Sequence, residues 1–156
     1  MSQTETIASI VLDDGNVVRR KSEVEQEREV ALADLLKENY FVPNGLNQGP
    51  YHLVLGTSEN RLLFRIMSPQ MAKEELVTLN VTPFRSIIRD YFIICESYFT
   101  AIKSSDPYRV EAIDMGRRGI HNEGSDLLRK LLADKISIDF VTARRLFTLI
   151  CVLHIK

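Results

Sequence analysis

The segment from Asp114 to Ser125 gathers the side chains of this chain that are best suited to binding or catalysis. It sets two carboxylates, two guanidiniums, an imidazole and an amide among three glycines, in a stretch that otherwise has helical spacing. On a continuous helix, four of its residues fall at i, i+4, i+7 and i+11 and share one face: Asp114, Arg118, His121 and Ser125. Arginine offers phosphate a rigid fork of donors, and histidine donates or shuttles a proton near neutral pH. The segment therefore predicts a site for an anion.

Three glycines, Gly116, Gly119 and Gly124, stand inside this helical stretch. Each costs a helix interior about 1 kcal/mol relative to alanine. We expect that cost to be offset in one of two ways, and the sequence leaves both open. Either the helix breaks here, or another backbone approaches it closely.

A second arginine pair, Arg144 and Arg145, lies in the first two turns of a predicted last helix. Cations are unfavourable near a helix N-terminus by a few tenths of a kcal/mol or more. We therefore expect them to pair with carboxylates such as Asp139 or Glu123, or with an anionic ligand. The predicted ligand-binding residues are Asp114, Arg117, Arg118, His121, Asn122, Glu123, Ser125, Arg144 and Arg145.

A buried polar network that ties helix to helix is the alternative interpretation of the same residues. Between residues 106 and 145, eight basic side chains nearly balance seven acidic ones. Such balance is typical of structural ion-pair networks, which often imitate functional sites.

Other chemistries have little support in the sequence. The three histidines, His52, His121 and His154, are dispersed and show no metal-ligand spacing, so we expect neither a metal nor a cofactor. Cys95 and Cys151 sit among apolar neighbours, which indicates buried free thiols. The chain has no nucleophile-elbow motif and no glycine-rich phosphate loop after a strand.

The composition bounds the partners and the location. The 156 residues carry 20 basic and 21 acidic side chains, a net charge of −1, so the charge does not indicate nucleic acid or a membrane surface as partner. Nucleic acid would require a local basic patch. The first residues do not resemble a secretory signal, and the longest apolar run, residues 146–153, is too short to span a bilayer. We expect a soluble cytoplasmic protein.

The elements that must position these residues follow from hydrophobic periodicity. Residues 7–12 predict a strand, with a turn at residues 13–16. A helix follows up to about Asn39, and its apolar stripe leaves Glu27 and Asp34 largely outside. Three alternating segments then predict an antiparallel meander: residues 51–55, 61–67 and 75–81.

After residue 81 the period changes from two to 3.6. Thr82-Pro83 predicts a helix start, and a wide apolar stripe continues to Ile102. Asp106-Pro107 opens the helix that leads to the glycines, and Asp139 caps a last helix that is apolar on most sides. The expected fold is α+β, one domain over residues 1–156, with a sheet-rich half (5–81) and a helical half (82–156) packed on the sheet.

Long strings along nearly the whole chain carry a family resemblance. They are Gly49-Pro50-Tyr51, Thr82-Pro83-Phe84-Arg85 and residues 90–98, 112–119, 121–125 and 142–154. In these strings the chain resembles the alphaproteobacterial group known as uncharacterised protein family 0262. The resemblance implies a bacterial cytoplasmic protein and assigns no activity, ligand or catalytic residue.

A shorter similarity points to an enzyme. Arg117 and His121, followed by Asn122 and Glu123, are similar to the Arg/His motif of the HEPN superfamily of helical nucleotide-binding domains and ribonucleases. That motif has four to six intervening residues, whereas three follow Arg117 and two follow Arg118 here, and those domains lack a β-rich half. The similarity implies His121 as general base for an RNA 2′-hydroxyl and an arginine that stabilises the phosphorane.

Three functional hypotheses result. We favour a non-enzymatic binding or interaction module that takes an anionic ligand or a protein partner. The second hypothesis is a metal-independent ribonuclease or nucleotide-processing enzyme that uses His121 with Arg117 or Arg118. In the third, the segment is a folding element only. The sequence leaves the ligand, the partner and the oligomeric state open.

Overall fold

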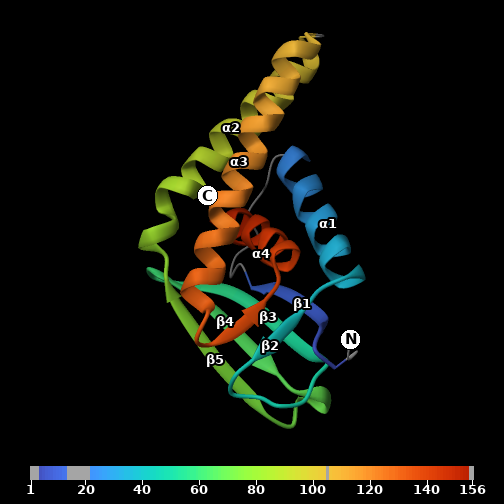
Figure 1. Ribbon diagram of the computed structural model, residues 1–156, viewed down its shortest axis with the longest axis vertical. Coiled ribbons are helices and arrows are strands. Elements are labelled where there is room, and N and C mark those ends of the chain that lie inside the picture. Colours follow the sequence, from blue (N-terminus) through green and yellow to red (C-terminus); the bar gives the residue numbers. More distant parts are fainter. Residues whose placement is uncertain (1–3, 14–21, 105, 155–156) are drawn as a thin grey trace.

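A four-stranded sheet forms one end of the molecule in the computed structural model, which describes residues 4–13, 22–104 and 106–154 (Figure 1). Its strand order is β1-β3-β4-β5. The strands are β1 (Ile7–Asp13), β3 (Tyr51–Ser58), β4 (Arg61–Met67) and β5 (Glu74–Asn80). The antiparallel pairing of β3, β4 and β5 confirms the predicted meander. The turn predicted at residues 13–16 lies outside the described residues after Asp13.

The first strand joins the sheet in parallel with β3. Parallel neighbours need a long crossover connection, and helix α1 (Ser22–Lys37) lies on it. Alternation decides which face of the sheet is buried. In β4, Leu62, Phe64 and Ile66 are fully buried while Arg61 and Arg65 face solvent.

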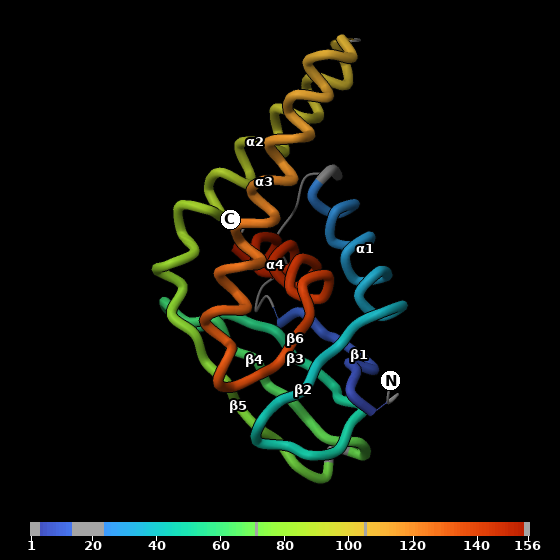
Figure 2. The backbone as a smooth tube through the Cα atoms, viewed as in Figure 1, coloured from blue at the N-terminus to red at the C-terminus, as the bar shows by residue number. Residues whose placement is uncertain are grey.

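The helices lie on one side of this sheet (Figures 1 and 2). Helices α2 and α3 form a hairpin that extends away from the sheet, and α4 lies between that hairpin and α1. The hairpin and the last helix are α2 (Arg85–Lys103), α3 (Pro107–Leu132) and α4 (Phe140–Leu153), and two short 3-10 turns are η1 (Pro69–Met71) and η2 (Thr82–Phe84). The α+β fold with a helical half packed on a sheet is therefore confirmed.

A second sheet of two short strands was not predicted. Strand β2 (Phe41–Pro43) pairs antiparallel with β6 (Ile136–Ile138), so the chain after α1 is joined to the chain after α3 (Figure 2). Three residues are too few to show a period, which explains why the sequence pattern missed both strands. The burial of Phe41, Ile136 and Ile138 ties this ribbon into the core.

Helix α4 is the centre of the core. Leu146, Phe147, Leu149 and Ile150 are all fully buried, which confirms a helix covered on most sides. The carboxylate of Asp139 accepts a hydrogen bond from the Thr142 backbone N–H at 2.8 Å and caps this helix as predicted. None of the described helices is long and apolar enough to cross a membrane.

Candidate functional site

Four of the nine predicted site residues line one cavity between α1, α3 and α4. Its volume is about 340 Å³. Arg117 and His121 come from α3, and Arg144 and Arg145 come from α4. The two acidic side chains of its lining, Glu27 and Asp34, come from α1. We call this space the cationic cavity.

His121 is a buried aromatic residue as much as a polar one. Its side chain is 5% exposed, and its ring stacks on Tyr91 with centroids 5.3 Å apart and planes inclined by 28°. Phe147 meets the same ring edge-on at 6.3 Å. The packing holds the imidazole in one orientation.

The polar contacts of His121 select a tautomer. Arg144 Nη2 lies 3.4 Å from His121 Nδ1. A guanidinium can only donate, so Nδ1 is the acceptor and the neutral ring carries its proton on Nε2. His121 Nε2 is buried and has no hydrogen-bond partner among the described residues.

The surroundings of His121 keep it neutral. Burial, and then the positive charges of Arg144 and Arg117, lower the pKa of His121 from 6.5 to about 4, and Asp114 opposes this shift. At neutral pH the ring is therefore uncharged, although two arginines, Arg144 and Arg117, lie near it.

Arg117 is held by partners that sequence reasoning missed. Its Nη2 lies 2.9 Å from Glu27 Oε1, with both side chains largely buried, and its guanidinium carbon lies 4.9 Å from the centre of the Tyr98 ring. Glu27 lies outside the apolar stripe of α1, as expected, and the structure places its carboxylate against Arg117 of α3. The hydrophobic pattern of α1 alone does not predict the pairing of Glu27 with Arg117.

Arg145 is a structural residue at the edge of the cavity. Its Nη1 donates to the backbone carbonyls of Asp34 at 3.0 Å and Glu38 at 2.9 Å, at the C-terminal end of α1. The Asp34 carbonyl also accepts from the Glu38 backbone N–H at 3.2 Å, and the guanidinium adds a donor at this helix end, where the last carbonyls lack helical partners. The cation is thus placed by the end of another helix, where the helix dipole favours it.

Arg144 differs from the other arginines of the cavity. The described residues offer it no carboxylate within ion-pair distance, and the one described polar contact of its side chain is the long one to His121. The expected ion pair of Arg144 with Asp139 or Glu123 is not formed among the described residues. Asp139 caps α4 instead, and Glu123 is exposed on α3.

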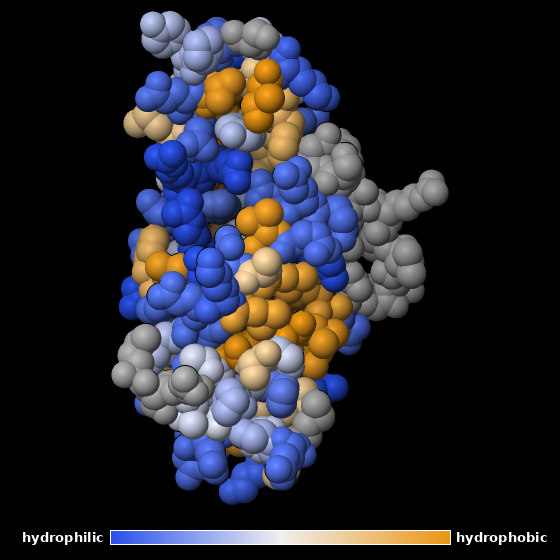
Figure 3. All heavy atoms as spheres, turned by 90° about the vertical axis from the view of Figure 1, so that its right-hand side faces the viewer, coloured by the Kyte–Doolittle hydropathy of each residue, from blue (hydrophilic) through white to orange (hydrophobic). Residues whose placement is uncertain are grey.

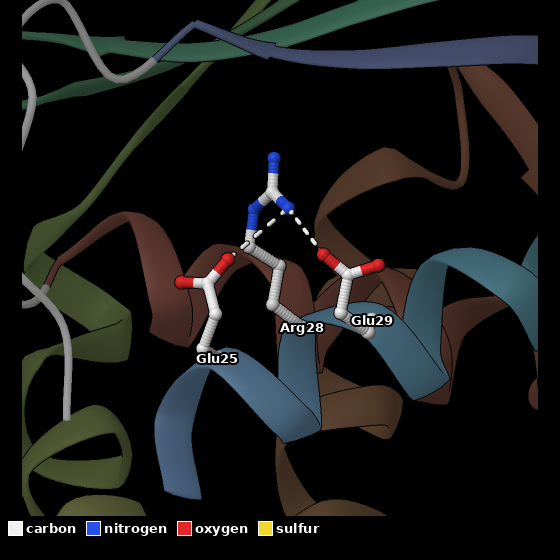
Figure 4. Close-up of polar contacts among 3 residues, drawn as sticks. All are labelled: Glu25, Arg28 and Glu29. Carbon is white, nitrogen blue, oxygen red and sulfur yellow. Dashed lines mark hydrogen bonds and ion pairs between the residues drawn. The ribbon is translucent and has the colours of Figure 1, made fainter. Parts of the chain in front are cut away.

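Arg28 on α1, in contrast, is paired with carboxylates. Arg28 Nη1 lies between Glu25 Oε1, at 3.4 Å, and Glu29 Oε1, at 3.1 Å (Figure 4). Two carboxylates balance this one guanidinium, so Arg28 has no charge left over for an anion. Arg144 has no such pair among the described side chains.

The other predicted site residues lie outside the cationic cavity. Arg118 forms an ion pair with Asp114 at 2.8 Å along the exposed side of α3. The Ser125 hydroxyl is buried and donates to the His121 carbonyl at 2.6 Å within the same helix. Asn122, like Glu123, is exposed. The shared helix face is therefore divided, because α3 is buried only along part of its length.

The glycines do not break the helix: α3 runs uninterrupted for 26 residues. The close approach occurs at Gly124, where the Phe147 side chain, rather than a backbone, packs against the helix. A Cβ added at Gly124 would overlap the Phe147 ring, and one added at Gly116 would lie 3.3 Å from Ile94 Cδ1. A Cβ at Gly119 would meet nothing within 4 Å.

The cysteines do not take part in the site. Both Cys95 and Cys151 are buried free thiols, as predicted. Burial raises the pKa of Cys95 to about 11 and that of Cys151 well above its ordinary value, so both stay protonated at neutral pH. The described residues contain no group of three or more His, Cys, Asp or Glu side chains that could hold a metal ion.

The fold and the site together define an α+β protein with a cationic cavity between helices. The model of the uncharacterised protein family UPF0262 matches residues 4–156, and the chain belongs to this family. A UPF0262 protein of Paramagnetospirillum magneticum is 55% identical over 100% of this chain and 99% of its own length.

Two further relatives agree with this assignment. A UPF0262 protein of Rhodospirillum rubrum is 53% identical over 100% of this chain and 96% of its own length. One from Caulobacter vibrioides is 52% identical over 95% and 92%. No solved structure matches the chain. The resemblance noted in the sequence strings is confirmed.

Proposed function

We propose that this protein is a non-enzymatic binding module, and that its cationic cavity holds an anionic group, a phosphate or a carboxylate, of a ligand or protein partner. The observation that carries the proposal is Arg144. It is a half-buried guanidinium that lines the cavity and has no carboxylate partner among the described residues. A partly desolvated charge without a counter-ion is unfavourable, and a bound anion would remove that cost.

The neighbours of Arg144 support the same conclusion. Arg117 adds a second positive charge, partly neutralised by Glu27, and the His121 ring positions Arg144 by accepting from it at Nδ1. Charge-assisted donors of this kind bind phosphate or carboxylate more strongly than neutral donors do. The volume of about 340 Å³ is at the small end of the range for ligand sites.

A ribonuclease that uses His121 with Arg117 or Arg118 is the less well supported hypothesis. A general base works best when its pKa lies near the operating pH, and the pKa of His121 is lowered to about 4. Arg117 is paired with Glu27, and Arg118 lies outside the cavity in an exposed pair with Asp114. These features favour binding over proton transfer.

The test is isothermal titration with inorganic phosphate, pyrophosphate and glutarate at low ionic strength. We expect at least one of these anions to bind the wild type and to bind Arg144→Gln at least tenfold more weakly. Arg118→Gln is the matched control, because it also removes one arginine, but one that lies outside the cavity. The affinity of this variant for the anions should differ from that of the wild type by less than twofold. Equal losses in both variants, or no binding of any of the three anions, would contradict the proposal.

A parallel assay separates binding from catalysis. Total bacterial RNA is incubated with the wild type and with His121→Ala in EDTA, and both proteins are melted to check their folding. We expect neither protein to cleave RNA. Cleavage by the wild type alone, at matching melting temperatures, would replace the binding proposal with the ribonuclease hypothesis.

A further inference from the structure

The cationic cavity is the inner end of a longer groove. It shares Glu27, Val30 and Arg117 with a second cavity of about 370 Å³ between α1 and the α2–α3 hairpin. The second cavity shares Tyr98 and Ile102 with a third, of about 580 Å³, nearer the hairpin end. We call the three together the hairpin groove.

The length of this groove can be read along α3. From Val110, in the outer cavity, to His121, in the inner one, the helix rises about 17 Å at 1.5 Å per residue. That distance equals about three turns of a second helix laid alongside α3.

The middle of the groove is open to solvent and has a mixed lining, with four apolar or aromatic side chains beside Gln26 and the Glu27–Arg117 ion pair. Val30 and Ile102 line it and are 53% and 49% exposed, and the Tyr98 and Phe99 rings lie beside them. Figure 3 shows this side of the molecule, with apolar surface near the end of the hairpin, hydrophilic surface below it, and apolar surface again beside α1. Exposed apolar side chains gathered along a groove are typical of an interaction site.

The two ends of the groove carry opposite charges. Arg144, which has no carboxylate partner among the described residues, stands at the inner end beside the Glu27–Arg117 ion pair. Asp106, Glu111 and Asp114 line the outer cavity, where Asp114 is paired with Arg118. A complementary ligand is negative at one end, apolar in the middle and positive at the other end. An anionic lipid does not match, because its tail would lie against the outer carboxylates.

The walls favour a helix over an extended peptide. Helices α1, α2 and α3 form them, so the groove offers no strand edge to pair with an extended backbone. A helix satisfies its own backbone hydrogen bonds and presents one apolar stripe. We propose that the hairpin groove binds an amphipathic helix of a partner protein, with an acidic residue of that helix against Arg144 and a basic one against Glu111. This inference rests on the proposed function, because Arg144 is the anion site in both.

The test begins with a displayed library of random 14-residue peptides, selected against the full chain at low ionic strength. We expect enriched peptides to carry apolar residues at i, i+3 or i+4, and i+7, with acidic residues toward one end. Their affinities are then measured as soluble peptides by fluorescence anisotropy. Ile102→Asp should weaken binding at least tenfold, and Ile93→Asp is the matched control, because Ile93 is 59% exposed on the same helix and does not line the groove.

A double-mutant cycle tests the orientation of the bound helix. Arg144→Gln should weaken the binding of an acidic-ended peptide about tenfold. The same substitution should change the affinity for a peptide with alanine in place of the acidic residues by less than twofold. Circular dichroism melting of each variant checks that the fold is retained. The absence of helical enrichment, binders that tolerate Ile102→Asp, or no effect of Arg144→Gln would each overturn the inference.

The outcomes also separate this inference from the proposed function. If small anions bind in an Arg144-dependent way but no helical peptide is enriched, the anion site stands and the helix proposal fails. If neither small anions nor peptides bind, both fail. A concentration-dependent dimer that Ile102→Asp abolishes in light scattering would assign the groove to a second copy of this chain and overturn the partner helix.

Discussion

His121 is a neutral ring at a positively charged point of the molecule. Tyr91 and Phe147 fix its plane, and Arg144 and Arg117 disfavour its protonation. A histidine in such a setting does not act as a pH switch near neutrality. Its part at pH 7 is to accept from Arg144 and so to hold that guanidinium at the cavity.

The lowered pKa of His121 predicts a loss of stability in acid. Because the folded pKa, about 4, lies below the ordinary 6.5, the unfolded chain binds this proton first as the pH falls. The stability is therefore fully present above about pH 6.5 and is lost progressively as the pH falls toward 4. At 1.36 kcal/mol per pKa unit the loss is on the order of 3 kcal/mol.

Urea unfolding of the wild type and of His121→Phe at pH 7 and pH 4.5 measures this loss. The phenylalanine variant keeps a stacked ring and removes the titration. We expect the wild type to lose more free energy of unfolding than the variant between the two pH values. Parallel losses would show that His121 is not the group responsible. An NMR titration that finds the pKa of His121 near 6.5 would contradict the account directly.

At the scale of elements, α3 is a helix that carries three glycines for different reasons. Gly124 gives room to the Phe147 ring of α4, and Gly119 faces open space. Of the two alternatives that the sequence leaves open, the break is absent, because the flanking leucines and the hairpin contact with α2 hold the helix together across the segment. Most helix stability in proteins comes from such packing rather than from propensity.

Alanine at these two glycines should therefore have opposite effects. Gly119→Ala should stabilise the protein by about 0.5–1 kcal/mol, because it improves helix propensity without contact. Gly124→Ala should destabilise it by about 1–3 kcal/mol, because the new methyl group overlaps the fully buried Phe147 ring. Thermal and urea unfolding of the matched pair measure both values. A stabilising Gly124→Ala would mean that Phe147 moves aside easily.

The periodic elements could be predicted from the sequence, and the short ones could not. The meander of β3, β4 and β5 and the long helices show periods over seven or more residues. Strands β2 and β6 have three residues each and form only because the fold brings together the segments that follow α1 and α3. A helical segment does begin at Thr82, as predicted. Its first turn is a 3-10 turn, and the α-helix α2 begins only at Arg85.

On the scale of the whole molecule, α4 joins the two halves that the sequence suggests. It packs on α1, α3 and α2 and also reaches β3 of the sheet. The ribbon of β2 and β6 adds a second connection between the halves. A single domain over residues 1–156 stays a prediction that unfolding can test.

We expect the chain to unfold in one cooperative transition. Far-UV circular dichroism reports the helices, and tyrosine fluorescence reports residues in both halves, because the five tyrosines are spread along the chain and tryptophan is absent. Urea curves from the two probes should coincide, since α4 cannot lose its packing on one half without exposing apolar surface of the other. Two separated transitions would divide the chain into independent units.

The sequence by itself determined the α+β class, the family and the residue types of the site, because periodicity and residue chemistry are local properties. It also placed Arg117, His121, Arg144 and Arg145 among the candidates. Only the tertiary structure decided that these four meet in one cavity, that Glu27 neutralises Arg117, and that Asp114, Arg118 and Ser125 stay outside it. The physical reason is that partners from α1, α3 and α4 are far apart in the chain, and the angles at which helices pack decide which side chains touch.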